Sequence, residues 1–405
     1  MADDINTFLV EEQNRVMYNI YRREQYSSPW ISLPRKAAWP EGIGSTFDNI
    51  MWERPRIDGE EAPWEQIDFS TLSNNNACIP PVDNVEFEQT LRRTALYHKA
   101  VHSPKLCVTD LLFTAKRDKQ LQNVEWGLAD TVRLYWIKWN RDGFTKNARK
   151  VVIKLGLPEN DETHGMVFPQ EAATSKLTNG VLDYFYGELT LEQGHRHALS
   201  MQGSRPVYGL ITDQFTSRSL TKGDDAVRED FRYGKPDHLF LPPGVSHTYN
   251  GFIHMIDDAP PRWNFNTALA GDAGGLSDSG DSEFTDAWEP VPHYVDGEVN
   301  PAYRTAEYQD SYIYVKEAYQ LRVPNSIAGV SMSKYDPQKF MGEVTWRNVV
   351  NMDASSNEYN PDGKIGRYRC VMTAGVEPIN PHVMFVLRHK VCDATEMLGL
   401  VGCAS

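Results

Sequence analysis

Cysteine is scarce in this sequence, and no two cysteines are closely spaced. The five cysteines are an odd number and lie far apart, at Cys78, Cys107, Cys370, Cys392 and Cys403. Structural zinc sites use CxxC pairs, and disulfide frameworks use even numbers of cysteines. We therefore expect reduced thiols, with neither zinc nor disulfides.

Long apolar runs and an excess of positive charge are also missing. No run approaches the roughly 18 apolar residues of a membrane-spanning helix, and the start MADDINTFLVEEQN lacks the basic and apolar regions of a signal peptide. We therefore expect no membrane partner and synthesis in a cytoplasm. Lys and Arg number 41 against 55 Asp and Glu, a net charge of −14. A surface of this sign repels phosphate backbones, so we expect only weak binding of DNA.

Common catalytic motifs are absent too, since the chain has no GxSxG, GxxxxGK[ST], HExxH or EF-hand loop. His195, His197 and His247 follow part of the HxH and PxGxxH pattern of cupin metal sites. However, Gln202 stands near the place of the usual Glu, and His195 and His197 follow a helix-like segment, where residues two apart do not share a face. A cupin-like, metal-dependent enzyme using these three histidines is kept as an alternative. Otherwise the sequence predicts no catalytic, cofactor or metal site.

Periodic apolar residues predict several regular elements. Helical spacing predicts helices over residues 4–24, 83–101, 109–140 and 174–192, the third being about 45 Å long, and shorter helices over 213–222 and 225–233. Residues 259–298, rich in Gly and Asp, are predicted to be a long irregular excursion. The strand patterns cover residues 150–156, 206–212, 238–242, 247–257, 306–317, 319–324, 340–349, 367–375 and 382–389.

The segment from Ser28 to Pro81 has no periodicity but many prolines and tryptophans. Trp39, Trp52, Trp64 and Phe69 lie among prolines that oppose helices and central strands. An extended segment this short cannot bury all four side chains on itself, and exposed aromatic side chains are costly. We predict that these four residues contact another copy of the chain.

Several sequence segments resemble those of the major capsid proteins of tailed bacteriophages, whose capsid fold is shared with herpesvirus floor domains. These segments cover most of residues 174–390. The N-terminal third of the chain resembles the same family in the order of its predicted elements. The segments are GVLDYFYGEL (180–189), PVYGLITDQFTSRSLTKGDDAVREDFRY (206–233), GFIHMIDDAPPRWNF (251–265), EAYQLRVP (317–324) and NPDGKIGRYRCVMTAGVEPINPHVMFVLRH (360–389).

The resemblance implies an α+β fold with an N-terminal arm, an extended loop, a peripheral domain built on a long spine helix, and an axial α/β domain. The C-terminal strands and tail, residues 356–405, are left unassigned between the two domains. We place the arm at 1–40, the extended loop at 41–82, the peripheral domain at 83–165 and 300–355 with its spine helix at 109–140, and the axial domain at 166–299.

The resemblance further implies a structural protein without catalysis. Copies would assemble into hexamers and pentamers of an icosahedral or prolate head that encloses double-stranded DNA without binding it tightly. The expected location is the virion, and the expected partners are a separate scaffolding protein and a portal, with a decoration protein left open. Besides the cupin-like enzyme, a virion protein that binds carbohydrate through its Trp-rich segment stays open as an alternative.

Overall fold

The computed structural model of the 405-residue chain describes part of its length. The N-terminal helix predicted at 4–24 lies outside the described residues, as do the helix predicted at 225–233 and the strand at 238–242. The described residues are 28–40, 45–50, 56–57, 85–86, 91–104, 106–107, 117–153, 176–191, 198–202, 205–222, 245–249, 251–269, 283–296, 298–316, 319–323, 326–327, 330–331, 342–348 and 365–391.

Helices and two large sheets together confirm the predicted α+β class. Within the described ranges, no helix is long and apolar enough to cross a membrane. The α-helices are α2 (Pro29–Ser32), α4 (Arg117–Asn147), α5 (Asn179–Leu191), α6 (Gln214–Lys222) and α8 (Pro301–Arg304), and the 3-10 helices are η3 (Thr267–Leu269) and η5 (Pro381–Val383).

A seven-stranded sheet forms one half of the structure. Its strands follow the order β1-β17-β21-β5-β2, with β20 and β6 also paired to β21. The pairs are antiparallel except for β1 with β17, which is parallel. The strands are β1 (Arg35–Ala38), β2 (Thr46–Ile50), β5 (Leu91–His102), β6 (Leu106–Cys107), β17 (Tyr319–Val323), β20 (Gly342–Asn348) and β21 (Ile365–Pro378).

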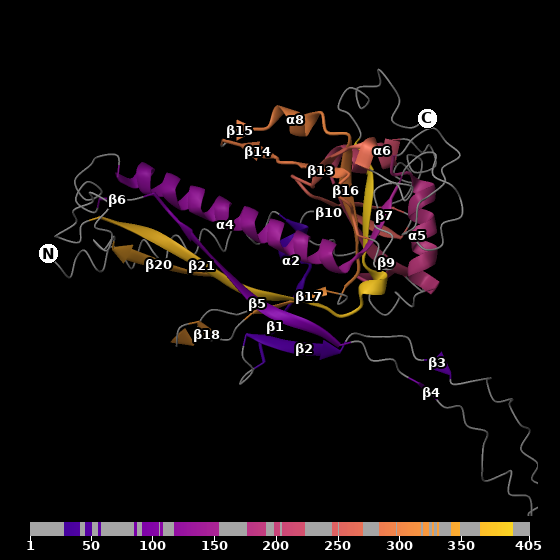
Figure 1. The fold of residues 1–405 in the computed structure, drawn as a ribbon, viewed down its shortest axis with the longest axis horizontal. Helices are drawn as coiled ribbons and strands as arrows, with labels where there is room; N and C mark the ends of the chain where they lie inside the picture. Colours follow the sequence, from indigo (N-terminus) through magenta and orange to yellow (C-terminus); the bar gives the residue numbers. More distant parts are fainter. Residues whose placement is uncertain are drawn as a thin grey trace, which may run out of the picture.

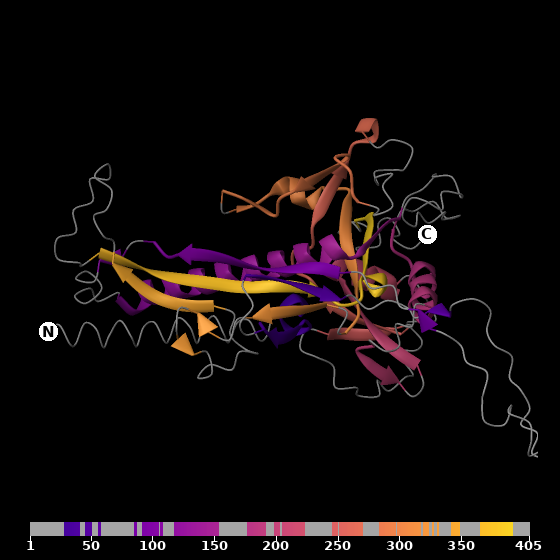
Figure 2. The same ribbon diagram turned by 60° about the horizontal axis from the view of Figure 1, so that its bottom comes forward.

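Two long strands and the spine helix give this half its length. At about 3.4 Å per residue, the 14 residues of β21 span about 48 Å and the 12 residues of β5 about 41 Å. Helix α4, with 31 residues, spans about 46 Å and runs beside both strands, as Figures 1 and 2 show. It covers only one face of the sheet.

A nine-stranded sheet forms the other half. Strands β10-β11-β9-β16-β12-β13 follow in that order, β22 pairs with both β16 and β7, and β8 pairs with β9. Helix α5 packs its apolar face on this sheet, with the rings of Phe185 and Phe385 5.1 Å apart. The strands are β7 (Arg149–Val152), β8 (Ser200–Gln202), β9 (Arg205–Thr212), β10 (Val245–Tyr249), β11 (Phe252–Ile256), β12 (Arg262–Phe265), β13 (Trp288–Val291), β16 (Tyr308–Tyr314) and β22 (Phe385–Lys390).

Three two-stranded sheets complete the strands that the structure describes. They are β3 (Arg56–Ile57) with β4 (Val85–Glu86), β14 (Tyr294–Val295) with β15 (Glu298–Val299), and β18 (Ser326–Ile327) with β19 (Val330–Ser331).

The two halves share one hydrophobic core, centred on Phe144 near the end of α4. The ring of Phe144 lies 5.9 Å from Tyr312 and 6.1 Å from Tyr314 of the nine-stranded sheet. It also lies 5.8 Å from Tyr319 of the seven-stranded sheet and 5.5 Å from Trp30 of α2. The chain passes between the halves from α4 to β7, from β16 to β17 and from β21 to β22. These closely packed crossings fix the orientation of one half against the other.

Most predicted elements are found where the pattern placed them. The spine helix, the helices near 174–192 and 213–222, and the described strands near 150–156, 206–212, 306–317, 319–324, 340–349, 367–375 and 382–389 are confirmed. The single strand predicted at 247–257 is wrong, because the chain turns at Gly251, where φ is +80°, and forms two antiparallel strands, β10 and β11. The spine helix continues past residue 140 to Asn147, since Phe144 is still buried in the core. The excursion predicted at 259–298 instead contributes two strands, β12 and β13, to the nine-stranded sheet.

The helix predicted at 83–101 is wrong, because residues 91–102 form strand β5. Leu91, Ala95 and His98 have helical spacing, which produced the prediction. Their backbone groups instead pair with β2 over the first half of β5 and with β21 over the second half. Each half of the segment is thus paired with a strand distant in sequence, so long-range pairing decides its structure.

The predicted domain ranges contribute strands to both sheets. Strands β7 and β16 fall inside the range predicted for the peripheral domain, yet they pair in the nine-stranded sheet. Of the unassigned C-terminal strands, β21 belongs to the seven-stranded sheet and β22 to the nine-stranded sheet. The boundaries of a peripheral and an axial domain stay a prediction.

Candidate assembly surface

Trp39, the first of the four predicted contact residues, belongs to the core of its own subunit. Its side chain is 7% exposed, and its ring lies 4.9 Å from that of Phe47 in an edge-to-face contact. Its backbone N–H donates to the carbonyl of Val323. This packing within its own subunit leaves little of the Trp39 ring for another copy, and a contact of Trp39 with another copy stays a prediction. Trp52, Trp64 and Phe69 lie outside the described residues.

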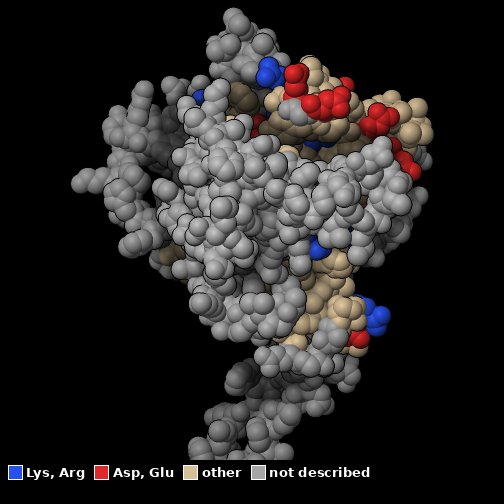
Figure 3. All heavy atoms as spheres, turned by 90° about the vertical axis from the view of Figure 1, so that its left-hand side faces the viewer, with Lys and Arg blue, Asp and Glu red and all other residues tan. Residues whose placement is uncertain are grey.

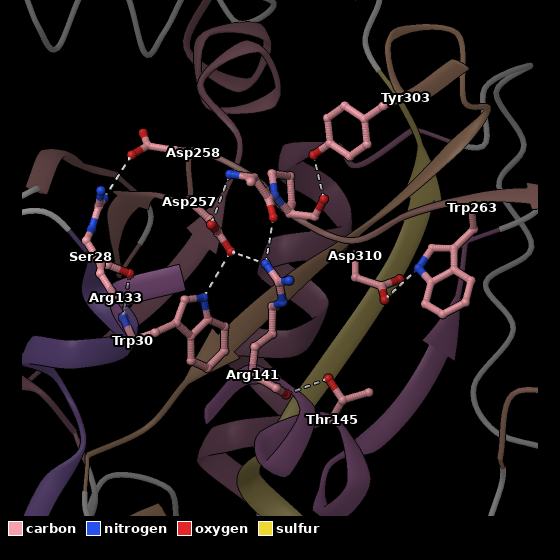
Figure 4. A network of polar contacts seen from close by, with 12 residues as sticks. Ser28, Trp30, Arg133, Arg141, Thr145, Asp257, Asp258, Trp263, Tyr303 and Asp310 are labelled. Carbon is pink, nitrogen blue, oxygen red and sulfur yellow. Dashed lines mark hydrogen bonds and ion pairs between the residues drawn. The ribbon is translucent and has the colours of Figure 1, made fainter. Parts of the chain in front are cut away.

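A buried polar network fixes the junction between the two halves (Figure 4). The indole Nε1 of Trp30 donates to Oδ2 of Asp257 at 3.0 Å, and the guanidinium of Arg141 reaches the same oxygen at 3.3 Å. Arg141 also donates to the carbonyl of Ala259 at 2.6 Å, and Asn140 donates to the carbonyl of Trp30 at 3.0 Å. Helices α2 and α4 are thus attached to the end of β11.

Charge in this network is balanced, not merely buried. Burial is the largest influence on Arg141 and opposes its charge, but the Asp257 carboxylate, Tyr312 and Asp142 together outweigh it, so the pKa of Arg141 is raised. The next residue, Asp258, bonds Arg133 at 3.5 Å from an exposed position. Of these two adjacent carboxylates, only Asp257 pairs with a buried cation, Arg141. Loss of the Asp257 charge would therefore leave Arg141 without this counterion.

A second buried ion pair lies inside the nine-stranded sheet. Arg388 is 0% exposed and Asp310 is 1% exposed, and two hydrogen bonds of 2.7 and 2.9 Å join them. The guanidinium lies 3.9 Å from the ring centre of Trp263 and 3.5 Å from that of Phe284. This bidentate, aromatic-lined pair is fully buried, so we assign it a structural role.

A short chain of hydroxyls leads to the buried imidazole of His389. Nδ1 of His389 lies 2.9 Å from the carbonyl of Lys390, which can only accept, so Nδ1 carries the proton. Nε2 then accepts from Ser311 at 2.7 Å, and Ser311 accepts from Thr212 at 2.7 Å. Burial lowers the pKa of His389, so the imidazole is neutral and serves packing.

The described structure has an apolar groove on the outer part of the seven-stranded sheet, beside α4. Its volume is about 240 Å³, and the Lys99 ammonium at its side lies 3.5 Å above the ring of Tyr135. The groove has the chemistry to bind an apolar or aromatic side chain, since most of its lining is aromatic or apolar. Its lining consists of Tyr97, His98, Lys99, Tyr135, Trp136, Trp139, Met372 and Ala374.

Large apolar side chains are exposed on both halves. Leu91, Tyr97, Leu134 and Tyr135 lie on β5 and α4. Others lie on α5, α6 and the β14–β15 hairpin, so the exposed apolar surface is distributed around the subunit. Figure 3 shows acidic side chains gathered along the upper rim of the end face. Many separate apolar contacts suit a subunit with several neighbours better than they suit one ligand pocket.

The residues of the cupin alternative are not assembled into a site by the described structure. His247 lies in β10, whereas His195 and His197 lie outside the described residues. Over the residues that the structure places, no three His, Cys, Asp or Glu side chains gather as metal ligands would.

Sequence reasoning missed the residues of the junction network. Asp257 directly follows a strongly buried strand, and Arg141 lies on the spine helix, which are signals that could have drawn attention to them. Their pairing crosses 116 residues of sequence. No local pattern specifies that distance, so the network becomes visible only in three dimensions.

Comparisons with known proteins give structural matches only. No protein-family model and no curated protein matches the chain. Among the solved structures, the capsid of Ralstonia phage GP4 matches with 10% identity and a TM-score of 0.45, covering 92% of this chain and 91% of that chain. The capsid asymmetric unit of cyanophage Pam1 matches with 10% identity and a TM-score of 0.41, covering 86% of each chain. The acidic stable capsid structure of Helicobacter pylori bacteriophage KHP30 matches with 8% identity and a TM-score of 0.41, covering 90% of this chain and 91% of that chain.

Proposed function

We propose that this chain is a major capsid protein, the structural subunit of a phage head. Copies assemble into hexamers and pentamers of an icosahedral or prolate shell, which encloses double-stranded DNA without binding it tightly. The segments quoted from residues 174–390 suggest the family. The geometry of the described residues supports the same assignment independently.

The supporting observation is the elongated half made of α4, β5 and β21. A helix of about 46 Å lies on strands of about 41 and 48 Å in a layer only one helix and one sheet thick. Such a layer exposes a large surface relative to its volume and leaves Leu91, Tyr97 and Leu134 outside. Contacts with further copies would remove this apolar surface from water, as at interfaces of about 1,600 Å².

Stiffness at the junction fits a shell subunit. The Trp30–Asp257–Arg141 network and the Phe144 ring cluster hold the two halves at a fixed angle. In a closed shell, curvature depends on the angle that each subunit maintains. The network thus supplies what assembly requires, and the proposal assigns it no catalytic role.

Assembly of the purified protein tests the proposal. The chain is expressed with and without a scaffolding protein and is followed by sedimentation and electron microscopy. Closed shells or ring-shaped capsomers are expected when the scaffold is present. A strictly monomeric chain at micromolar concentration with scaffold present would overturn the proposal. A scaffold, a portal and synthesis in a host cytoplasm belong to the same proposal.

A further inference from the structure

The end of the seven-stranded sheet farthest from the junction carries a basic face. Met372 and Ala374 of β21 line the groove beside α4, so their side chains face that helix. Because side chains alternate along a strand, Arg367 and Arg369 face the opposite side. His102 of β5 is directly opposite Arg369 in register and shares that side.

Within the described part of the chain, no ion pair offsets the repulsion between the positive charges of this face. Arg367 and Arg369 are half-buried and have no ion pair there, and the Nε of Arg369 is buried without a hydrogen-bond partner. Slight burial and the charges of both arginines lower the pKa of His102. Like charges this close on a sheet are destabilising, so the face would be stabilised by an anionic partner.

The β14–β15 hairpin supplies the complementary charge. Residues 283–300 contain acidic side chains but no Lys or Arg, although the chain has 41 basic residues. Asp296 and Glu298 lie at the tip of the hairpin, are exposed, and have no ion pair among the described residues. Figure 1 shows the hairpin projecting from the nine-stranded half.

The hairpin is apolar as well as acidic, and its base is firmly held. Tyr294 is 49% exposed, Val295 47% and Val299 40%. Tyr294 pairs with Val299 on one face and Val295 with Glu298 on the other, so apolar side chains are exposed on both faces. At the base, Asn300 donates to the carbonyls of His293 and Pro292, both at 2.9 Å. An isolated two-stranded hairpin is marginal in water, which favours an additional contact surface.

We propose that the acidic β14–β15 hairpin of one copy docks on the basic sheet face formed by Arg367, Arg369 and His102 of a second copy. The contact joins different surfaces of the two copies, so its repetition generates a ring or a lattice. This inference rests on the proposed assembly and identifies one of its contacts. Opposite charges guide the encounter, and Tyr294, Val295 and Val299 lose exposed surface when the hairpin docks.

Charge exchange between the two surfaces provides the test. One variant carries Arg367→Glu and Arg369→Glu, a second carries Asp296→Lys and Glu298→Lys, and a third carries all four substitutions. Each of the first two variants is expected to lower the yield of assembled particles about tenfold, since like charges then face each other. The four-substitution variant restores opposite charges and should recover at least about half of the wild-type yield.

Controls separate folding from contact. Lys316→Glu with Lys390→Glu changes the net charge as much as the arginine variant does, but away from both surfaces, and should assemble normally. Circular dichroism and the melting temperature report whether each subunit folds. If a charge reversal prevents folding, the neutral variants Arg367→Gln with Arg369→Gln and Asp296→Asn with Glu298→Gln replace it, with a smaller loss of yield expected.

The outcomes are distinct. Folded reversal variants that assemble as well as wild type would overturn the inference and leave the proposed function standing. A four-substitution variant no better than the weaker pair would overturn it as well. Arginine variants that lose duplex DNA binding but assemble normally would assign the basic face to nucleic acid instead. A wild-type chain that never assembles would overturn the proposed function itself.

Discussion

The indole of Trp30 donates a hydrogen bond of 3.0 Å to the carboxylate of Asp257, 227 residues farther along the chain. This bond attaches the first described helix to the end of a central strand of the nine-stranded sheet. Arg141 of the spine helix shares the same carboxylate oxygen. Three segments from different parts of the sequence therefore depend on one buried acidic group.

Replacement of Asp257 by Ala should destabilise the subunit by about 3 kcal/mol or more, because it leaves a buried arginine without its counterion. Asp258→Ala is the matched control, since the Asp258 side chain is 74% exposed and its pair with Arg133 is at the surface. We expect that variant to stay within about 0.5 kcal/mol of wild type. Denaturant unfolding of the purified subunit measures both. Equal effects at the two positions would contradict the role given to Asp257.

The buried pair of Arg388 and Asp310 yields a second prediction. Asp310→Ala should cost about 3–5 kcal/mol of unfolding free energy, because Arg388 keeps its charge without a partner. Changing both residues, Arg388→Met with Asp310→Leu, should cost less than the single change, since no isolated charge is then left buried. Intrinsic tryptophan fluorescence in denaturant follows the unfolding of each variant. A double variant less stable than Asp310→Ala would contradict this reasoning.

Two glycines should respond to alanine with opposite signs. Gly251 has φ +80°, and a Cβ there would lie 2.3 Å from the ring of Tyr186, so Gly251→Ala should destabilise the subunit by about 1–3 kcal/mol. Gly127 lies in α4 with nothing within 4 Å of its Cβ position, so Gly127→Ala should stabilise by about 0.5–1 kcal/mol. Thermal unfolding compares the two variants, and a shift of the same sign in both would refute the prediction.

Local apolar patterns predicted the elements whose buried residues have the same spacing in the folded chain as the pattern in the sequence. Strands β9, β16 and β22 are almost continuously buried, and their runs of branched and aromatic residues predicted them. Helix α5 has its four buried residues at helical spacing, so the sequence pattern predicted it as well. Strand β5 was not predicted, because its partner β21 lies more than 250 residues away and no local signal identifies that partner.

The candidate surfaces were predicted only in part. Aromatic side chains among prolines indicated a segment needing a partner surface, but they could not show that Trp39 finds that surface within its own subunit. Likewise, the acidic run of residues 283–300 and the basic residues of β21 are visible in the sequence. Only the pairing register shows that Arg367, Arg369 and His102 share one face.

Acid should weaken the subunit through His389. Burial lowers the pKa of His389 below 6.5 in the folded state, so the unfolded chain takes up the proton first as pH falls. Its stabilising contribution is complete above about pH 6.5 and is lost as pH falls toward the folded-state pKa. The hydrogen bond to the Lys390 backbone and the nearby Asp213 and Asp310 oppose the shift without reversing it. In His389→Gln, melting temperatures measured from pH 7.5 to 5 should fall less steeply than in wild type; an unchanged slope would contradict the assignment.

The remaining aromatic residues of the extended segment distinguish subunit folding from assembly. Trp39→Ala should destabilise the subunit by about 3 kcal/mol or more, because its ring packs on Phe47 in the core. Trp52→Ala with Trp64→Ala should leave the fold intact and sharply reduce shell yield, since aromatic anchors at interfaces commonly contribute about 2 kcal/mol or more each. Circular dichroism, melting temperature and sedimentation with scaffold separate the two effects. If the Trp52 and Trp64 variant unfolds as a monomer, those side chains belong to the subunit core, as Trp39 does. If it assembles with normal yield and stability, the extended segment is not an anchor between copies.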